Sequence, residues 1–371
     1  MKKQILFLLL ALFAGISMAF GQFVPRPIEC ITGDALHPIP GNPYEYAITV
    51  PAPPSGTWSG LHYRWFVTQS QTFINNFNFA AVVEANGGPF MDVTGGSLYN
   101  IEYDDPGTLP NIQITWKSFV YNPAQPIFVG ILVVGENGIC TPNNMKIYRI
   151  EPQHAFSLDI ANVQGATIHD GYGSNVDNCI SDILGASYNI AQDAVDYDFG
   201  IDTLYYAVLA ANWSGFWQLR VQLNGLQTGQ SADIHWGYLY DHTDPNIGFG
   251  NLVILGATAN GDWTSSVLVV PQGGASSVGQ AGQMIYIRLI LHHGTQFEGT
   301  INTQYALAVN GNISDGTNII PGFSDVHHLC NGGPGGTPVQ ADFDDIALQT
   351  LLARPAIQNN TVGGTFLPIA N

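Results

Sequence analysis

Aspartates form the densest group of residues in this sequence that could bind a metal ion. Asp193, Asp196, Asp198 and Asp202 follow one another at short spacing. Carboxylate oxygens gathered on one loop can bind Ca²⁺, which takes about six to eight oxygen ligands. The stretch lacks the glycine and glutamate positions of an EF-hand loop. It therefore predicts either a calcium site or a solvated acidic loop that leads into a strand at Leu204.

A second acidic group lies near the end of the chain. Asp342, Asp344 and Asp345 could supply oxygen ligands to such a site from a distant part of the sequence. Asp344 has an alternative role, because an aspartate ahead of an amphipathic segment can cap a helix. The spacing of Leu, Ile and Ala in Asp345–Ala353 is compatible with such a helix, and we expect one there.

Two pairs of neighbouring histidines, His292-His293 and His327-His328, invite a zinc hypothesis. Neighbouring residues on a strand point to opposite faces, so neither pair can readily chelate one ion. One histidine of each pair could still join a site that takes its other ligands from elsewhere. The simpler interpretation places both pairs at the ends of strands or in loops.

Tryptophans in the second half of the chain suggest a second kind of site. Trp213 and Trp263 lie beside glycine, serine or aspartate, so we expect exposed rings on which a sugar could stack. Trp217 is in phase with Leu219 and Val221 and is expected in the core. Trp65 and Trp116 are likewise expected in the core of the first half. Glycan binding is therefore one alternative function.

Sequence signatures of catalysis are lacking. No G-x-S-x-G elbow and no H-E-x-x-H run occurs. A hydrolase that uses two carboxylates on facing elements remains an alternative. The sequence favours a protein that is not an enzyme.

Short alternating apolar runs recur along the whole chain and indicate an all-β fold. In Ile112-Gln113-Ile114-Thr115-Trp116 and in Trp217–Leu223 the apolar residues fall on one face. The expected strands are Tyr44–Val50, Leu61–Thr68, Ile112–Tyr121, Ile127–Val134, Met145–Ile150, Phe156–Ile160, Leu204–Ala210, Phe216–Leu223, Ile234–Tyr240, Leu252–Ala257, Ser266–Val270, Met284–His292 and Tyr305–Val309. Their length and rhythm predict two Ig-like β-sandwiches, the second larger and elaborated.

The N-terminus resembles a signal peptide. Lys2 and Lys3 precede an apolar run, Ile5–Phe13, and a small-x-small pattern at Ala19-Phe20-Gly21. The run is shorter than the roughly 18–20 residues of a membrane span. We expect residues 1–21 to be a signal peptide, residues 22–152 and 153–353 to be the two sandwiches, and residues 354–371 to be a loosely ordered tail. The mature protein would be exported to the periplasm, the cell surface or the medium.

Four cysteines, Cys30, Cys140, Cys179 and Cys330, predict two disulfides in an oxidising compartment. Three pairings are open from the sequence. We prefer Cys30–Cys140 and Cys179–Cys330, because each bond would then close one sandwich.

Charge excludes some partners. The chain has 28 acidic and 10 basic residues and a net charge of −18, which becomes −20 without Lys2 and Lys3. Such a surface repels nucleic acids and anionic membranes.

The first half resembles a known family. Tyr63-Arg64-Trp65-Phe66-Val67, Ile112–Trp116 and Phe128–Val134 followed by Asn137-Gly138-Ile139-Cys140 resemble the PKD-like domains of exported Bacteroidota proteins. The chain departs from that pattern by inserting Ile139 between the glycine and the cysteine. The resemblance covers Cys30–Pro152 and implies a spacer or binding module of surface proteins linked to gliding motility or type IX secretion.

Together these features predict a non-catalytic surface protein with a structural, adhesion or assembly role. Its expected partners are cell-surface or secretion-system proteins, or glycans. Self-assembly is a further alternative, because exposed sheet edges can pair between chains.

Overall fold

The computed structural model describes residues 23–75, 78–79, 91–94, 110–119, 122–138, 140–170, 174–244, 246–340 and 342–357. Regular secondary structure in these residues consists of strands alone, which confirms the all-β prediction. The described part has no helix of the length and apolar character that crossing a membrane requires. The predicted signal peptide and most of the predicted tail lie outside the described residues.

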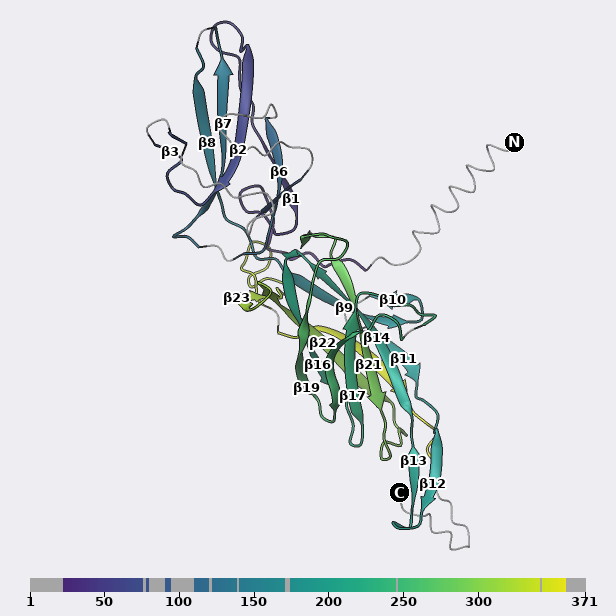
Figure 1. Cartoon of the computed structure of the whole chain (residues 1–371). Coiled ribbons are helices and arrows are strands. Elements are labelled where there is room, and N and C mark those ends of the chain that lie inside the picture. Colours follow the sequence, from purple (N-terminus) through teal and green to yellow (C-terminus); the bar gives the residue numbers. More distant parts are fainter. Residues whose placement is uncertain are drawn as a thin grey trace, which may run out of the picture.

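The N-terminal sandwich packs one three-stranded sheet on another (Figure 1). The sheets are antiparallel, in the orders β1 (Pro43–Ala47), β6 (Asn111–Trp116), β5 (Met91–Thr94), and β2 (Gly60–Thr68), β7 (Ile127–Glu136), β8 (Asn143–Ile150). A short pair, β3 (Ile74–Asn75) and β4 (Asn78–Phe79), lies apart from them.

Alternation along the strands builds this core. Ile112, Ile114 and Trp116 on β6 are fully buried, as is Trp65 on β2. The Trp116 indole N–H donates to the Tyr46 hydroxyl at 3.0 Å, so its polar edge is satisfied inside the core. The expected core tryptophans of the first half are confirmed.

The C-terminal sandwich is larger and packs two six-stranded sheets face to face. One sheet has the order β10 (Thr167–His169), β9 (Ser157–Gln164), β14 (Ile201–Ala211), β21 (Gln283–His292), β17 (Ser231–Gly237), β18 (Asn251–Ala257). The other has the order β11 (Asn175–Cys179), β24 (Asp345–Leu352), β22 (Thr303–Ser314), β16 (Phe216–Asn224), β19 (Gly261–Val269), with β23 (Ile319–Ser324) beside β22. Two further pairs join β12 (Gly185–Asn189) to β13 (Ala194–Asp198) and β15 (Trp213–Ser214) to β20 (Ser277–Val278).

Strand β16 shows how the larger core forms. Trp217, Leu219, Val221 and Leu223 all point inward and are fully buried. Residues between them on the strand are more exposed, as the period of two predicts.

The helix expected at Asp345–Ala353 is wrong, because this segment forms strand β24. It pairs in parallel with β11 and antiparallel with β22. Asp345, Ala347 and Leu351 are buried from this strand. A position between two strands satisfies the backbone on both sides and outweighs a weak local helical preference.

An N-terminal arm, residues 23–31, lies on the C-terminal sandwich although the sequence-based division gives it to the first. Phe23 packs with Val163 and Leu209 of that sandwich. Arg26 forms ion pairs with Asp159 and Asp345.

The disulfide pairing differs from the preferred one. Cys30 is bonded to Cys330, whereas Cys140 and Cys179 are free and exposed. The preferred bonds Cys30–Cys140 and Cys179–Cys330 are therefore wrong. The reason is the arm, which carries Cys30 to the C-terminal sandwich.

The two sandwiches lie end to end (Figure 1). Polar and apolar residues meet at the junction, among them Ser118, Ser214 and Phe119. Ser118 and Ser214 exchange two hydrogen bonds, each from a backbone N–H to the other hydroxyl, at 2.5 and 3.1 Å. The Asn42 amide donates to Asn212 Oδ1 at 3.1 Å. These bonds act beside the disulfide to fix the junction.

Replacing Cys30 with serine should lower the free energy of unfolding by about 2 to 5 kcal/mol, because the cross-link no longer restricts the unfolded chain. Chemical denaturation without reductant measures the change. The matched variant Cys140→Ser should leave stability unchanged. Thiol titration of the unfolded wild type should find two free thiols, and finding none would contradict the observed pairing.

Candidate metal centre

Three aspartates meet at one end of the C-terminal sandwich. Each of Asp325, Asp344 and Asp345 offers one carboxylate oxygen, and the three oxygens lie within 4.8 Å of one another. Asp325 directly follows β23, Asp344 directly precedes β24, and Asp345 begins β24. Asp325 and Asp345 are buried, and Asp344 is partly exposed.

Local backbone geometry explains how two neighbouring aspartates reach one place. Side chains of successive residues in a regular strand point to opposite faces. Phe343 has a left-handed backbone with φ of 58°, so the extended run is broken just before Asp344. The Phe343 ring is buried beneath the Arg220 guanidinium, 4.8 Å from the ring centre, which holds this turn.

Each carboxylate has one oxygen engaged by the protein. Asp325 Oδ1 accepts the Leu158 backbone N–H at 2.8 Å. Asp345 Oδ1 accepts from the Arg26 guanidinium at 2.7 Å. Asp344 Oδ2 lies 2.9 Å from His327 Nε2.

Two of the remaining oxygens, Asp325 Oδ2 and Asp344 Oδ1, are buried and accept no hydrogen bond from an N–H or hydroxyl group of the described residues. When Asp325 or Asp345 is protonated, these two carboxyls share a hydrogen bond. A buried polar atom left unpaired costs roughly 1–3 kcal/mol, and more when it is charged. Such atoms call for an explanation, and a bound ion is one.

Burial raises the pKa of Asp325 well above its usual range, and the neighbouring Asp345 and Asp344 carboxyls raise it further. Burial also raises the pKa of Asp345 to about 7, with Asp344 and Asp159 adding to the shift and Arg26 opposing it. Without a cation the group therefore retains protons. The residues fit a hard cation, because every free donor is a carboxylate oxygen.

The four aspartates singled out first are not brought together. Asp193 accepts the Tyr188 hydroxyl, Asp196 accepts the Asn189 amide at 2.9 Å, and Asp198 accepts the Gly200 N–H at 3.0 Å. Asp202 lies on β14 and contacts His293 instead. Because Asp196 and Asp198 are two residues apart on β13, they are separated by about 7 Å along the strand.

Of the second acidic group, Asp344 and Asp345 join the metal centre and Asp342 remains exposed outside it. The sequence analysis missed Asp325 and Arg26. Asp325 stands alone between Ser324 and Val326 with no spacing signal. Only the return of the chain to the same end of the sandwich places it there.

The pair at the end of β21 separates as the strand geometry predicts, whereas His327 and His328 lie outside any strand and their rings stack, with centres 4.5 Å apart. His293 is fully buried, with Nε2 2.6 Å from Asp202 and Nδ1 2.8 Å from the Gln230 amide. His292 is more exposed and lies 2.9 Å from Asp233. One member of the other pair, His327, contacts Asp344 of the aspartate group. The ring of His328 stacks on the ring of His327.

Trp213 is fully buried, and its indole N–H donates to the Ala210 carbonyl at 3.1 Å. The prediction that its ring is exposed for a sugar is therefore wrong. Strand β15 turns the side chain inward against Trp217, with the ring centres 6.3 Å apart. Trp263 on β19 is half-buried and packs on the core.

An aromatic group missed by the sequence analysis lies on the outer face of the other sheet. Tyr205, Tyr240 and Tyr286 are half-buried, and the ring centre of Tyr240 lies 5.0 Å from Tyr205 and 5.6 Å from Tyr286. The Arg288 guanidinium lies 5.1 Å from the ring centre of Phe249 beside them. We call Tyr205, Tyr240, Tyr286 and Arg288 the tyrosine face. Its residues come from β14, β21 and the segment after β17.

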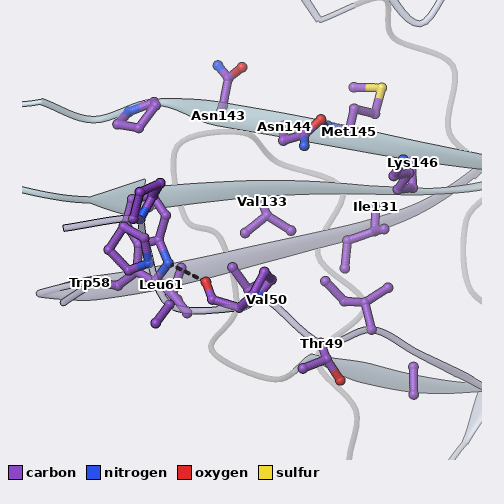
Figure 2. Close-up of a pocket in the computed structure, with 18 of the residues that line it drawn as sticks. Thr49, Val50, Trp58, Leu61, Ile131, Val133, Asn143, Asn144, Met145 and Lys146 are labelled. Atoms are coloured by element: carbon purple, nitrogen blue, oxygen red, sulfur yellow. Dashed lines mark hydrogen bonds between the residues drawn. The ribbon is translucent and has the colours of Figure 1, made fainter. Parts of the chain in front are cut away.

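An apolar groove of about 620 Å³ opens in the N-terminal sandwich. Figure 2 shows Leu61, Ile131 and Val133 along it, with Trp58 at one end donating to the Pro51 carbonyl at 2.9 Å. Lys146 and Tyr148 are its titratable lining residues. The described lining therefore offers no pair of carboxylates for acid–base catalysis.

The sequence matches no protein-family model and no curated protein. Among solved structures, the chain is similar to AvmM, which catalyses macrocyclization in alchivemycin A biosynthesis, with 9% identity, a TM-score of 0.24 and coverage of 56% and 94%. The major pilin SpaD of Corynebacterium diphtheriae gives 9% identity, a TM-score of 0.23 and coverage of 72% and 58%. The collagen-binding domain of the Erysipelothrix rhusiopathiae surface protein RspB gives 6% identity, a TM-score of 0.17 and coverage of 87% and 83%. In each case the first coverage value is the percentage of this chain and the second is the percentage of the matched chain. Likeness at this level carries no argument about function.

In a chelator, stability should fall as pH rises from about 4.5 to about 7.5. Because the folded-state pKa values of Asp325 and Asp345 are raised, the folded state keeps protons that the unfolded state has already released. Asp325→Asn keeps the acceptor for Leu158 N–H and removes one charge. The difference in unfolding free energy, variant minus wild type, should increase by roughly 2 kcal/mol between the lower and the upper end of this pH range.

Denaturation curves at several pH values measure this difference. Comparing the two proteins cancels the opposite contribution of His154, whose pKa burial lowers. Parallel pH profiles for wild type and variant would contradict the prediction.

Proposed function

We propose that this chain is an exported, non-catalytic surface protein with a structural, adhesion or assembly role, linked to gliding motility or type IX secretion. One observation carries the proposal: two β-sandwiches lie end to end and are fixed to each other by the arm, the Cys30–Cys330 bond and the junction hydrogen bonds. A linked pair of this kind keeps a binding surface at a set distance from its attachment. The signal-like N-terminus and the PKD-like pattern support this role.

The organisation in domains follows from the same proposal. Residues 22–152 are the proposed spacer, apart from the arm at residues 23–31, which lies on the larger domain. That larger domain, residues 153–353, carries the ligand-binding surfaces. Other cell-surface proteins, secretion-system proteins or glycans are its partners. Calcium is the cation that we propose for the aspartate group, because its free donors are all oxygen atoms.

Cells that lack the chain should lose attachment or spreading, and the wild-type gene should restore it. The Cys30→Ser variant should restore it poorly, because the arm loses its covalent tie, whereas Cys140→Ser should restore it fully. Fractionation with external protease checks that the chain reaches the surface. A chain confined to the cytoplasm, or normal attachment without it, would overturn the proposal.

Glycan binding is a second candidate function, favoured by the tyrosine face. Tyrosine rings stack on the apolar faces of sugars, while hydroxyls and a guanidinium supply hydrogen bonds to sugar hydroxyls. Tyr286 and Arg288 are partly accessible and lie two residues apart on the same outward face of β21. Because Trp213 is buried, the tyrosine face is the surface on which we propose that a sugar would bind.

A glycan array with the mature chain tests this candidate. Tyr286→Ala should reduce any specific signal at least about tenfold, which corresponds to about 1.4 kcal/mol of stacking energy. Trp263→Ala on the opposite sheet is the matched control and should retain the signal. Equal loss in both variants, or no specific signal in the wild type, would reject the tyrosine face.

A further inference from the structure

We propose that a calcium ion held by Asp325, Asp344 and Asp345 closes the base of the loop formed by residues 326–343, and through this loop holds the N-terminal arm. This inference rests on the proposed calcium and adds a regulatory role to it. We call residues 326–343 the latch loop. Its two ends meet at the metal centre, since Asp325 precedes the loop and Asp344 follows it.

The first step is that the site is built for a ligand. Asp325 is fully buried, its Oδ2 accepts no hydrogen bond from an N–H or hydroxyl group of the described residues, and one of its oxygens lies within 4.8 Å of an oxygen of each of the other two aspartates. Asp344 Oδ1 is also buried and unpaired. Two buried oxygens without an N–H or hydroxyl donor, within one group of three aspartates, are what a divalent cation would satisfy.

Charge supports the same assignment. Asp159, Asp325, Asp344 and Asp345 bring four carboxylates together, and Arg26 is the arginine paired with two of them. A divalent ion would offset most of the remaining negative charge. The Asp344 side chain is 28% exposed, which leaves a route from solvent to the site.

The second step is that the latch loop has few ties of its own. Its internal pairing in the described residues consists of two isolated bridges, Val326 with Gln340 and Asn331 with Thr337, and a few turn hydrogen bonds such as Gly336 N–H to the Gly333 carbonyl at 2.9 Å. Gly332, Gly333 and Gly335 at its tip have positive φ. No regular strand runs through the described part of the loop, so beside the Cys30–Cys330 bond its order depends on its base, where closing the loop costs chain entropy.

The third step connects the loop to the arm. Glu29 N–H donates to the His328 carbonyl at 3.0 Å, and Glu29 Oε1 accepts the Cys330 N–H at 3.0 Å. Ile28, Val326 and Cys330 share a small buried cluster with Ala155. Arg26 reaches Asp345 at the metal centre itself. A cation that orders the base of the latch loop therefore also stabilises the arm and shields the Cys30–Cys330 bond.

The test uses the full mature chain and two measurements. Titration calorimetry with calcium chloride measures binding. Hydrogen exchange by mass spectrometry follows peptides from residues 23–31 and 325–345, with β2 and β7 peptides as internal controls. At a calcium concentration of 100 times Kd, exchange through local opening of the arm and the loop should slow by about a hundredfold relative to chelator. The control peptides should not change.

Variants sharpen the result. Asp325→Asn and Asp344→Asn should each abolish calcium binding and the protection of the arm, while exposed Asp342→Asn should keep both. Reduction of the Cys30–Cys330 bond by a thiol should be faster in chelator than in calcium in the wild type and insensitive to calcium in Asp344→Asn. Because Asp344 is partly exposed, we expect Asp344→Asn to fold, and this variant therefore tests the proposal even if Asp325→Asn does not fold.

Two outcomes separate the hypotheses. If calcium binds and Asp344→Asn abolishes binding, but exchange of the arm and the loop is unchanged, the latch is wrong and the calcium site stands. If the folded wild type binds no calcium at millimolar concentration, both the calcium assignment and the latch are overturned.

Discussion

The attachment of the N-terminal arm to the C-terminal sandwich is the constraint on which the arrangement of this protein depends. The Cys30–Cys330 bond joins residues 300 positions apart in the sequence. The arm precedes the first sandwich in the chain and binds the second. The chain segments that enter and leave the N-terminal sandwich are therefore both attached to the C-terminal sandwich. Ser118 and Ser214 then need only short polar contacts to fix the junction.

The same region explains why so many polar groups are buried there. Arg26 pairs with Asp159 and Asp345, and Asp325 holds the backbone at Leu158. Partly satisfied buried networks are costly unless a further group completes them. The buried oxygens of Asp325 and Asp344 without an N–H or hydroxyl donor lie in this network, and the proposed cation would complete it. The contacts that hold the arm and the three aspartates thus lie in one region, formed by the arm, the latch loop and the start of β24.

The two sandwiches have different surfaces. The N-terminal one presents an apolar groove without paired acids, and the C-terminal one presents the metal centre and the tyrosine face. Separate surfaces on a linked pair accord with the proposed role of spacing and presenting contacts. The function proposed for the chain follows from this division.

The sequence by itself determined the strands with strict alternation and their buried faces, because alternation along a strand is a local property. Ile112–Trp116 and Trp217–Leu223 show it directly. The sequence missed short strands such as β11, β12, β13 and β23. Only the tertiary structure decided the role of Asp345, which local spacing assigned to a helix and strand pairing placed in β24. It also decided the partner of Cys30, the burial of Trp213 and the meeting of Asp325 with Asp344. These depend on contacts between residues far apart in the chain, and no local pattern encodes such contacts.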